Sequence, residues 1–328
     1  MSDNLVSIII PCFNARKWIG ECLQSCLAQT YKNVEIIVVD DGSTDESVAI
    51  ISSFRSSKIK LVQQGNRGAC AARNNGLRLA KGQWIQYLDA DDLISENKLQ
   101  EQITLLQGRE NFLAICPTVI FFDEQNPFTL PVKIPEFIQR ADSPSDLLIK
   151  MWGGRESAQG GRILPGAWLS PRSVVEQAGL WDETLTADQD GEYFCRVVLK
   201  SLGVVLTADA AHYYRKISNY TNLSAQENVA AYESRLRSIY SKKRNLFLTC
   251  DNTLARQAIA FQAISLALRT YPSYRAISYK AMSLADEMGY GMELFRGKRP
   301  KLYWASKWLN WKICAYLLFL YRRLGYSE

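Results

Sequence analysis

The first third of the chain alternates short apolar runs with segments whose apolar residues recur at helical spacing. The run at 34–39 has a single polar residue, as expected of a parallel strand that is buried on both faces. Similar runs lie at 5–10, where Pro11 is expected to end the strand, and at 59–62 and 84–88. Strands that alternate with crossover helices predict a mostly parallel sheet with helices on both faces, the α/β class.

Three carboxylates, Asp89, Asp91 and Asp92, directly follow the run 84–88. Open α/β sheets bind ligands beyond the carboxyl ends of their strands. Asp89 and Asp91 are separated by one residue, so in an extended chain their oxygens share a side and suit Mg²⁺ or Mn²⁺ that carries substrate phosphates. The alternative is an acidic turn before a helix, with Asp92 or Ser95 as the N-cap.

Polar turns also follow the other runs, at 11–14, at 40–45 and at 64–73. These turns should converge at one edge of the sheet, where carboxylates can accept from a base or ribose and arginine can face phosphate. The sequence after the first run is P-C-F-N-A-R, which lacks the G-x-G-x-x-G of dinucleotide-binding folds, and the P-loop pattern is absent. A nucleotide site without redox or kinase-like chemistry is therefore indicated.

Composition adds limits to this interpretation. The 328 residues can bury a large core, and eight scattered cysteines with one histidine argue against a structural zinc site. Reduced thiols, and a start at Met1 that shows no basic signal region, predict a cytoplasmic protein. The net charge of +6 is concentrated at 296–328, which holds eight Lys or Arg and one acid.

Four motifs in this order resemble the family 2 glycosyltransferases of the GT-A fold: S-I-I-I with P-C-F-N, V-V-D-D-G-S-T-D, N-R-G-A-C-A-A-R-N-N-G and Y-L-D-A-D-D. The resemblance covers roughly the first 220 residues, and we expect 1–223 to form the catalytic domain, with 1–95 as its nucleotide-sugar half and 96–223 as its acceptor half. It implies a Rossmann-like sheet, a nucleotide-diphosphate sugar donor and inversion by a single displacement.

The resemblance implies a role for each motif. Asp40 would bind the nucleotide base, in a pocket lined by Pro11 and Phe13. Asp89–Ala90–Asp91 would be the DxD motif, in which Asp91 ligates the metal and Asp89 lies near the ribose or the metal. The expected nucleotide-sugar contacts are Pro11, Phe13, Asn14, Asp40, Asp41, Arg73, Asp89, Ala90 and Arg215.

The segment Q-D-G-E-Y-F-C-R, residues 189–196, resembles the family segment that carries the catalytic base. Alignment on Arg196 makes Asp190 the base, and Asp188 is the alternative. Apolar residues after Asp190 recur at helical spacing, so these acids should stand at a helix N-terminus, where the dipole favours their charged form. Helix capping alone is the other interpretation.

His212 lies in a strand-like run that continues to Arg215. A lone histidine is more often structural than a ligand, and the position where the family carries a histidine holds Ile217 here. Arg215 is therefore the stronger candidate for a phosphate or acceptor contact, with His212 as a minor candidate for the metal.

Upstream, Pro117 within 113–122 indicates an edge strand or a break. The glycine-rich segment 152–162 is expected to be an acceptor-binding loop or a plain connector.

Beyond residue 224 the pattern is helical, with expected helices at 227–247, 254–268 and 277–288 that form a helical appendage over 224–297. The tail, 298–328, contains a Trp-rich basic stretch at 302–324. Its apolar run is too short to span a membrane. A helix that lies in the membrane interface is one interpretation, and a helix docked on the protein or in a dimer is the other.

The sequence therefore predicts a metal-dependent inverting glycosyltransferase that uses Mn²⁺ or Mg²⁺ and a UDP-linked sugar donor. Its acceptor would be a glycan or lipid-linked glycan, at the cytoplasmic face of the membrane. One alternative is a sugar-1-phosphate nucleotidyltransferase, although the glycine-rich phosphate loop that it needs after the first strand is missing. The other is a non-catalytic glycan- or nucleotide-binding module, against which the three acids Asp89, Asp91 and Asp190 argue.

Overall fold

A computed structural model describes residues 4–135, 138, 143–153, 161–217, 226–296 and 300–324. The chain divides into two compact units. The first consists of 1–135, 163–183 and 200–220, and the second consists of 136–162, 184–199 and 221–328. The units are discontinuous in sequence, because the segments 136–162 and 184–199 group with the C-terminal helices. The expected boundary at 223 lies outside the described residues.

Within its described residues, the first unit contains a seven-stranded sheet in the order β3-β2-β1-β4-β8-β6-β9. The strands are β1 Val6–Cys12, β2 Val34–Asp40, β3 Ile59–Gln63, β4 Trp84–Tyr87, β6 Phe112–Ile115, β8 Trp168–Pro171 and β9 Gly203–Leu206. Strand β1 pairs in parallel with both β2 and β4, and Ile9 is opposite Ile37 and Tyr87. This register confirms the predicted parallel α/β arrangement and places the carboxyl ends of β1, β2 and β4 side by side.

A second sheet, in the order β5-β10-β7, lies in the same unit. Its strands are β5 Leu93–Ile94, β7 Thr118–Phe122 and β10 His212–Lys216. Pro117 separates β6 from β7, which belong to different sheets, so the predicted break is confirmed. The expectation that Pro11 ends the first strand is wrong, because Pro11 pairs with Val39 and β1 continues to Cys12. Proline at the end of a strand removes only one ladder hydrogen bond.

The helices of this unit are α1 Ile19–Leu27, α2 Ser47–Ser53, α3 Ala69–Leu79, α4 Lys98–Leu106 and α7 Arg172–Ala178, with 3₁₀ turns η1 Pro127–Thr129 and η2 Pro165–Ala167. Helix α3 lies directly against β1 and β2, because a Cβ at Gly76 would overlap Ile9. Helix α4 begins after Asn97, whose side chain makes no cap hydrogen bond. The N-cap interpretation of Asp92 and Ser95 is therefore wrong.

A buried lysine supports β4 from within the core. The Nζ of Lys98 donates to Gln86 Oε1 on β4 and to Gln102 Oε1 at 2.7 Å, and Gln102 Nε2 donates to the backbone oxygen of Ala167 at 3.1 Å. Burial lowers the pKa of Lys98 to about 8. These bonds connect α4 and η2 to β4, the strand that carries the acidic turn, and so fix the position of this strand.

The depressed pKa of Lys98 makes stability depend on pH. The unfolded state keeps the proton up to the ordinary pKa of 10.5, whereas the folded state releases it at about 8. Between these values the unfolded state binds more protons, so raising the pH stabilises the fold. We expect the free energy of unfolding of the parent to rise relative to that of Lys98→Met across this window. Urea denaturation of both proteins on either side of it measures the difference, and a constant difference would contradict the assignment.

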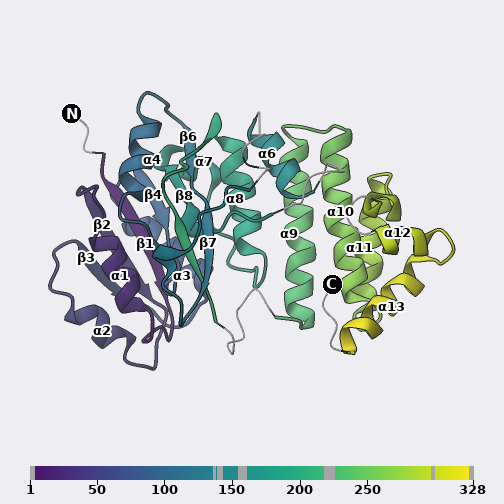
Figure 1. Cartoon of the computed structure of the whole chain (residues 1–328), viewed down its shortest axis with the longest axis horizontal. Coiled ribbons are helices and arrows are strands. Elements are labelled where there is room, and N and C mark those ends of the chain that lie inside the picture. The colour runs from purple at the N-terminus through teal and green to yellow at the C-terminus, as the bar shows by residue number, and fades with distance from the viewer. Residues whose placement is uncertain are drawn as a thin grey trace. The chain divides into compact units, whose positions relative to one another are not determined.

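The second unit is helical, and Figure 1 shows α9, α10 and α11 side by side. Its elements are α6 Pro144–Met151, α8 Gln189–Lys200, α9 Val229–Phe247, α10 Thr253–Thr270, α11 Arg275–Glu287, the 3₁₀ turn η4 Met292–Phe295, α12 Pro300–Ser306 and α13 Trp311–Arg323. The three helices expected beyond residue 224 are confirmed. None of the helices in the described part of the chain is long and apolar enough to cross a membrane.

The tail differs from the single helix expected at 302–324. It forms α12 and α13, and the side chain of Asn310 caps α13 by accepting from the backbone N–H groups of Lys312 and Ile313 at 3.0 and 3.1 Å. Cys314 and Ala315 of α13 are buried, and α13 packs on α10. The docked interpretation is therefore correct for one face of α13.

Candidate functional site

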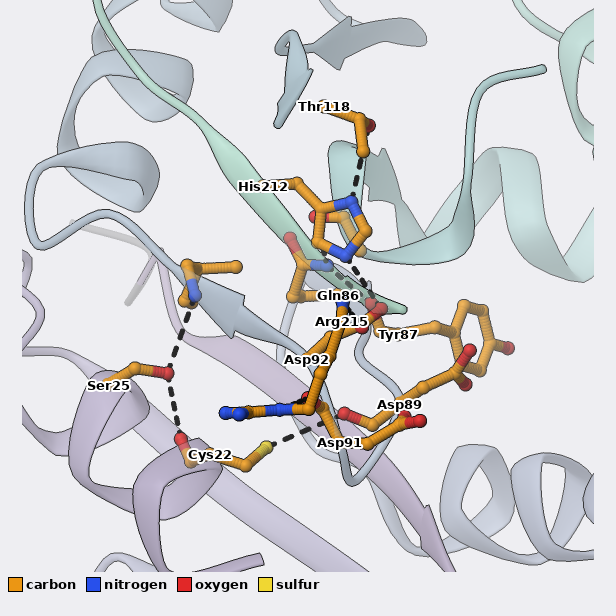
Figure 2. Close-up of polar contacts among 12 residues, drawn as sticks. Cys22, Ser25, Gln86, Tyr87, Asp89, Asp91, Asp92, Thr118, His212 and Arg215 are labelled. Carbon is orange, nitrogen blue, oxygen red and sulfur yellow. Dashed lines mark hydrogen bonds and ion pairs between the residues drawn. The ribbon is translucent and has the colours of Figure 1, made fainter. Parts of the chain in front are cut away.

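The acidic turn follows β4, as expected, and its three carboxylates have different surroundings (Figure 2). Asp89 Oδ1 accepts from Arg73 Nη2 of α3 at 2.7 Å and remains one-third exposed. Cys22 Sγ of α1 lies 3.6 Å from the backbone oxygen of Asp89. The turn is thus held between α1 and α3, and it brings the predicted residues Arg73 and Asp89 together.

Asp92 is fully buried and serves the structure of the turn. Its Oδ2 lies 2.8 Å from His212 Nε2, its Oδ1 accepts from the backbone N–H of Arg215 at 3.0 Å, and His212 Nδ1 lies 3.2 Å from the Thr118 hydroxyl (Figure 2). Burial, followed by the nearby Lys98, lowers the pKa of His212 to about 3, so the imidazole is neutral. Both ring nitrogens have protein partners, and this arrangement gives no support to His212 as a metal ligand.

Arg215 connects three separate elements around this turn. Its Nε donates to the backbone oxygen of Asp91 at 2.9 Å, its Nη1 to Asp123 at 2.9 Å and its Nη2 to Glu21 at 2.6 Å. The guanidinium also lies over the ring of Phe121, 4.6 Å from its centroid. Arg215 therefore orders the acidic turn itself, and Glu21 and Asp123 are participants that the sequence did not indicate.

Asp91 has a different environment from its neighbours. In the described part of the chain, no Lys or Arg side chain forms an ion pair with its carboxylate. Burial raises the pKa of Asp91 well above its ordinary value, and the charges of Asp92 and Asp89 raise it further. Without a counter-charge the ionised form of Asp91 is therefore disfavoured, and a bound cation would supply that counter-charge.

The residues present fit a divalent cation that is shared with substrate. No group of three or more His, Cys, Asp or Glu among the described residues is arranged to hold a metal alone. Mg²⁺ and similar ions are commonly held by one or two carboxylates together with substrate phosphates and water. Asp91, with Asp89 beside it, would hold such an ion, and phosphate oxygens would complete its coordination.

Asp40, at the end of β2, faces the same edge of the sheet and is almost completely buried. Its Oδ2 accepts from the backbone N–H of Ser43 at 3.3 Å, whereas its buried Oδ1 has no hydrogen-bond partner among the described residues. Burial, then the charge of Asp40, raises the pKa of the Cys12 thiol to about 12. An unsatisfied buried carboxylate oxygen is costly unless a ligand donates to it.

The neighbouring turns are fixed by side chains from the predicted set. Asn14 Oδ1 accepts from the backbone N–H of Thr44 at 2.8 Å, which links the ends of β1 and β2. Asp41 accepts from the backbone N–H groups of Arg67 and Gly68 at 2.9 and 2.7 Å, so it shapes the loop before α3. Phe13 is half-exposed at the same edge.

Trp181 contacts Arg73, and the sequence did not indicate this contact. The Arg73 guanidinium lies over its ring, 4.5 Å from the centroid, and Tyr87 of β4 packs edge-on against it at 5.2 Å between centroids. Asn74 holds the Trp181 backbone with two hydrogen bonds of 2.9 Å. Arg73 is therefore fixed from two sides, by Asp89 and by Trp181.

The candidate bases lie in the second unit. Asp190 stands in the first turn of α8, as predicted, and Asp188 precedes that helix in the left-handed region, with φ of 58°. Asp188 Oδ2 accepts from Lys242 Nζ at 2.5 Å and from Ser238 Oγ at 2.7 Å. Glu192 is buried in a two-point pair with Arg196, at 2.9 Å for each bond. Asp188 and Glu192 therefore have structural partners, and the role of Asp190 as the base stays a prediction.

Residues 7–158 match the family described as Glycosyl transferase family 2. The chain is 26% identical over 244 residues to the glycosyltransferase GlyG of Streptococcus pneumoniae, a match that covers 74% of this chain and 80% of GlyG. It is 40% identical over 111 residues to the Escherichia coli WfaP, a UDP-Glc:alpha-D-GlcNAc-diphosphoundecaprenol beta-1,3-glucosyltransferase. That match covers 34% of this chain and 44% of WfaP, so it spans less than half of that relative.

Solved structures show the same fold. Residues 1–349 of S. aureus TarS, in complex with UDP-GlcNAc, align with a TM-score of 0.61 and 16% identity over 86% of this chain and 90% of that one. The mannosyltransferase PcManGT of Pyrobaculum calidifontis, in complex with GDP-Man and Mn²⁺, aligns with a TM-score of 0.53 and 17% identity over 97% and 87% of the two chains.

Proposed function

Because the chain is a family 2 glycosyltransferase with the GT-A fold, we propose that it transfers a sugar from a UDP-linked donor to a lipid-linked glycan, with inversion and with a divalent cation. The observation that carries this proposal is the acidic turn after β4. There Asp89 and Asp92 have protein partners and the Asp91 carboxylate is left for a cation.

Recognition of the nucleotide is assigned to Asp40. Its buried Oδ1 can accept from a base N–H, which would satisfy an atom that the described protein residues leave without a partner. Phe13, half-exposed at the same edge, would cover the base. The uracil of UDP offers an N–H donor, and the UDP-GlcNAc complex of TarS supports a UDP-linked donor.

We assign the binding of the diphosphate and the compensation of its charge to Asp91, through a cation, and to Arg73. A bound divalent cation would neutralise the charge that develops on the leaving diphosphate. Asp91 would hold that ion, and the Mn²⁺ in PcManGT supports this choice. Arg73, fixed by Asp89 and Trp181, would orient the nucleotide from the side of α3.

The acceptor hydroxyl needs a base, and we assign Asp190. It would take the proton as the hydroxyl oxygen attacks the anomeric carbon and the bond to the diphosphate breaks, so that inversion needs only one displacement. A lipid-linked acceptor is supported by WfaP, whose name gives a GlcNAc diphosphoundecaprenol substrate.

Acceptor-dependent release of UDP tests the proposal. The protein, Mn²⁺ and each UDP-sugar of a panel are incubated with and without a lipid-linked glycan, and UDP and glycoside are both measured. One sugar should give equal amounts of the two products. Release of pyrophosphate would indicate the nucleotidyltransferase instead, and binding without turnover across the panel would indicate a non-catalytic module.

The tail offers a surface for the membrane in which a lipid-linked acceptor would reside. Trp304 and Trp308 are 63% and 89% exposed, and α13 is docked on α10 by its other face. The exposed apolar residues of α13 and its end are Ile313, Tyr316, Leu317, Leu320, Tyr321 and Leu324. Exposed Lys301, Lys307, Lys312 and Arg323 lie among these apolar side chains. Aromatic and basic residues together fit the interface of an anionic bilayer.

The 328-residue chain with Trp304→Ser and Trp308→Ser should float with anionic liposomes several-fold less than the parent. Salt should weaken binding of the parent, because each basic residue near such a surface contributes about 1 kcal/mol. Leu248→Ser, at a site that is 83% exposed just after α9, is the matched control and should bind like the parent. If the double variant floats equally well while keeping its melting temperature, α12 and α13 are not the membrane surface.

A further inference from the structure

One polar face of α9 runs along the chain segment that leads into α8. Ser234 Oγ accepts from the backbone N–H groups of Thr186 and Ala187, at 2.9 and 3.0 Å, and donates to the Ala187 oxygen at 2.8 Å. One turn later Ser238 donates to the Asp188 carboxylate at 2.7 Å, and after another turn Lys242 donates to the same oxygen at 2.5 Å. A spacing of four residues puts these three side chains on one face of the helix.

Neighbouring positions of α9 extend this contact at both ends. Arg237 Nη2 donates to the backbone oxygen of Thr184 at 2.8 Å, and Ser241 Oγ donates to Glu192 Oε1 at 2.7 Å. Helix α9 thus binds the segment from Thr184 to Glu192, and Asp190 lies within it. The family match ends at residue 158, so both partners lie outside it.

The segment is held in a conformation that it would not adopt easily by itself. Asp188 has φ of 58°, which is unfavourable for a residue with a side chain. A Cβ at Gly191 would overlap the Asp188 carboxylate and would come within 2.8 Å of Lys242 Nζ, so a side chain here would displace one of these two groups. Strained backbone persists where the surroundings over-determine it, and it concentrates at functional sites.

Lys242 is almost fully buried, as are Ser234 and Ser238. Besides Asp188 it contacts Gln262 Oε1 of α10 at 3.3 Å and lies 5.6 Å from the centroid of the Trp152 ring. A buried ion pair contributes little net stability compared with well-packed apolar residues. The main effect of these contacts is therefore to fix the backbone conformation at the start of α8.

We propose that Ser234, Ser238 and Lys242 of α9 are positioning residues that fix the turn before α8 and thereby orient Asp190 toward the acceptor hydroxyl. The inference rests on the proposed function, in which Asp190 is the base. It makes α9 part of the catalytic machinery, in place of the separate appendage that the sequence indicated.

Lys242→Met tests the inference, because it removes the ammonium group and keeps an apolar side chain of similar length. We expect kcat to fall by tenfold to about 10²-fold, since a misplacement of about 1 Å costs up to that much. The KM for the donor and the UDP-dependent thermal shift should stay at parental values. Lys242→Arg should recover much of the rate because it keeps a charged donor, and Ser238→Ala is a milder second variant.

Lys243→Met is the matched control. Lys243 is the next residue of α9 and pairs with Glu287 of α11. This variant should keep parental kcat. A double variant, Asp190→Asn with Lys242→Met, should be no slower than Asp190→Asn alone, because a residue that acts only through Asp190 adds nothing once Asp190 is changed.

The outcomes separate the two proposals. If Asp190→Asn loses transfer while folded Lys242→Met and Ser238→Ala keep parental kcat, the inference is overturned and the base assignment stands. Further loss in the double variant, in proportion to the single losses, would show a general structural role and would also overturn it. If Asp190→Asn transfers sugar at the parental rate, the base assignment fails and the inference fails with it.

Discussion

Asp91→Asn should lose most of the metal-dependent stabilisation by UDP while the protein remains folded. In the parent, UDP at about 100 times its Kd with Mn²⁺ should add roughly 2.7 kcal/mol to the free energy of unfolding. The variant should gain much less, because the carboxylate that no Lys or Arg of the described chain neutralises is also the one assigned to the cation. Thermal unfolding with UDP, with and without Mn²⁺ or Mg²⁺, measures this difference.

Glu21→Gln is the matched control for Asp91→Asn. Glu21 is an acid close to the same turn, and its carboxylate pairs with Arg215 Nη2 at 2.6 Å. This variant should keep the metal-dependent shift, because the amide oxygen of glutamine can still accept from Arg215 and the charge that is removed is one that Arg215 already compensates. A parental shift that ignores the metal, or that survives Asp91→Asn unchanged, would show that the cation is not held by this turn.

Local patterns were sufficient to predict the first four strands and the edge of the sheet at which their turns meet. The nearly continuous apolar run at 34–39 predicted a buried strand, and its pairing with β1 places Asp40 beside Cys12 at the end of β1. The acidic turn after β4 followed from the same argument. Parallel pairing then requires these turns to meet, so the prediction did not depend on side-chain detail.

Contacts between residues far apart in sequence could not be predicted in this way. Arg215 was expected at phosphate or acceptor, but it binds Asp91, Asp123 and Glu21, which lie on different elements. Trp181 stacks on Arg73, and Asn74 of α3 holds the Trp181 backbone in the loop after α7. No periodicity or spacing in the sequence records such a pairing.

The break between α12 and α13 also could not be predicted from the sequence. The apolar stripe at 302–324 suited one continuous helix, yet Asn310 caps a new one at Trp311. A short polar side chain satisfies the free N–H groups of a helix start, which makes a break at this point inexpensive. The pairing of Asp188 with α9 also could not be seen, because the helical pattern of 227–247 carries no sign of what its polar face contacts.

Asp190→Asn should abolish most of the sugar transfer while the protein binds UDP and metal normally. Loss of a general base costs about 10² to 10⁴ in rate, whereas loss of a helix cap costs only about 1 kcal/mol of stability. The variant should therefore keep nearly the parental melting temperature and the parental UDP-dependent shift. Steady-state transfer to the lipid-linked acceptor, measured beside thermal unfolding, separates the two roles.

Asp188→Asn is the comparison that decides between the two acids. Its amide oxygen can still accept from Lys242 and Ser238, so the turn before α8 should hold and much of the activity should remain. If Asp188→Asn is the inactive variant and Asp190→Asn is active, the base lies two residues earlier than proposed. If both transfer sugar at near-parental rates, the proton leaves the acceptor through another group. Only strong loss confined to Asp190→Asn fits a base in the first turn of α8.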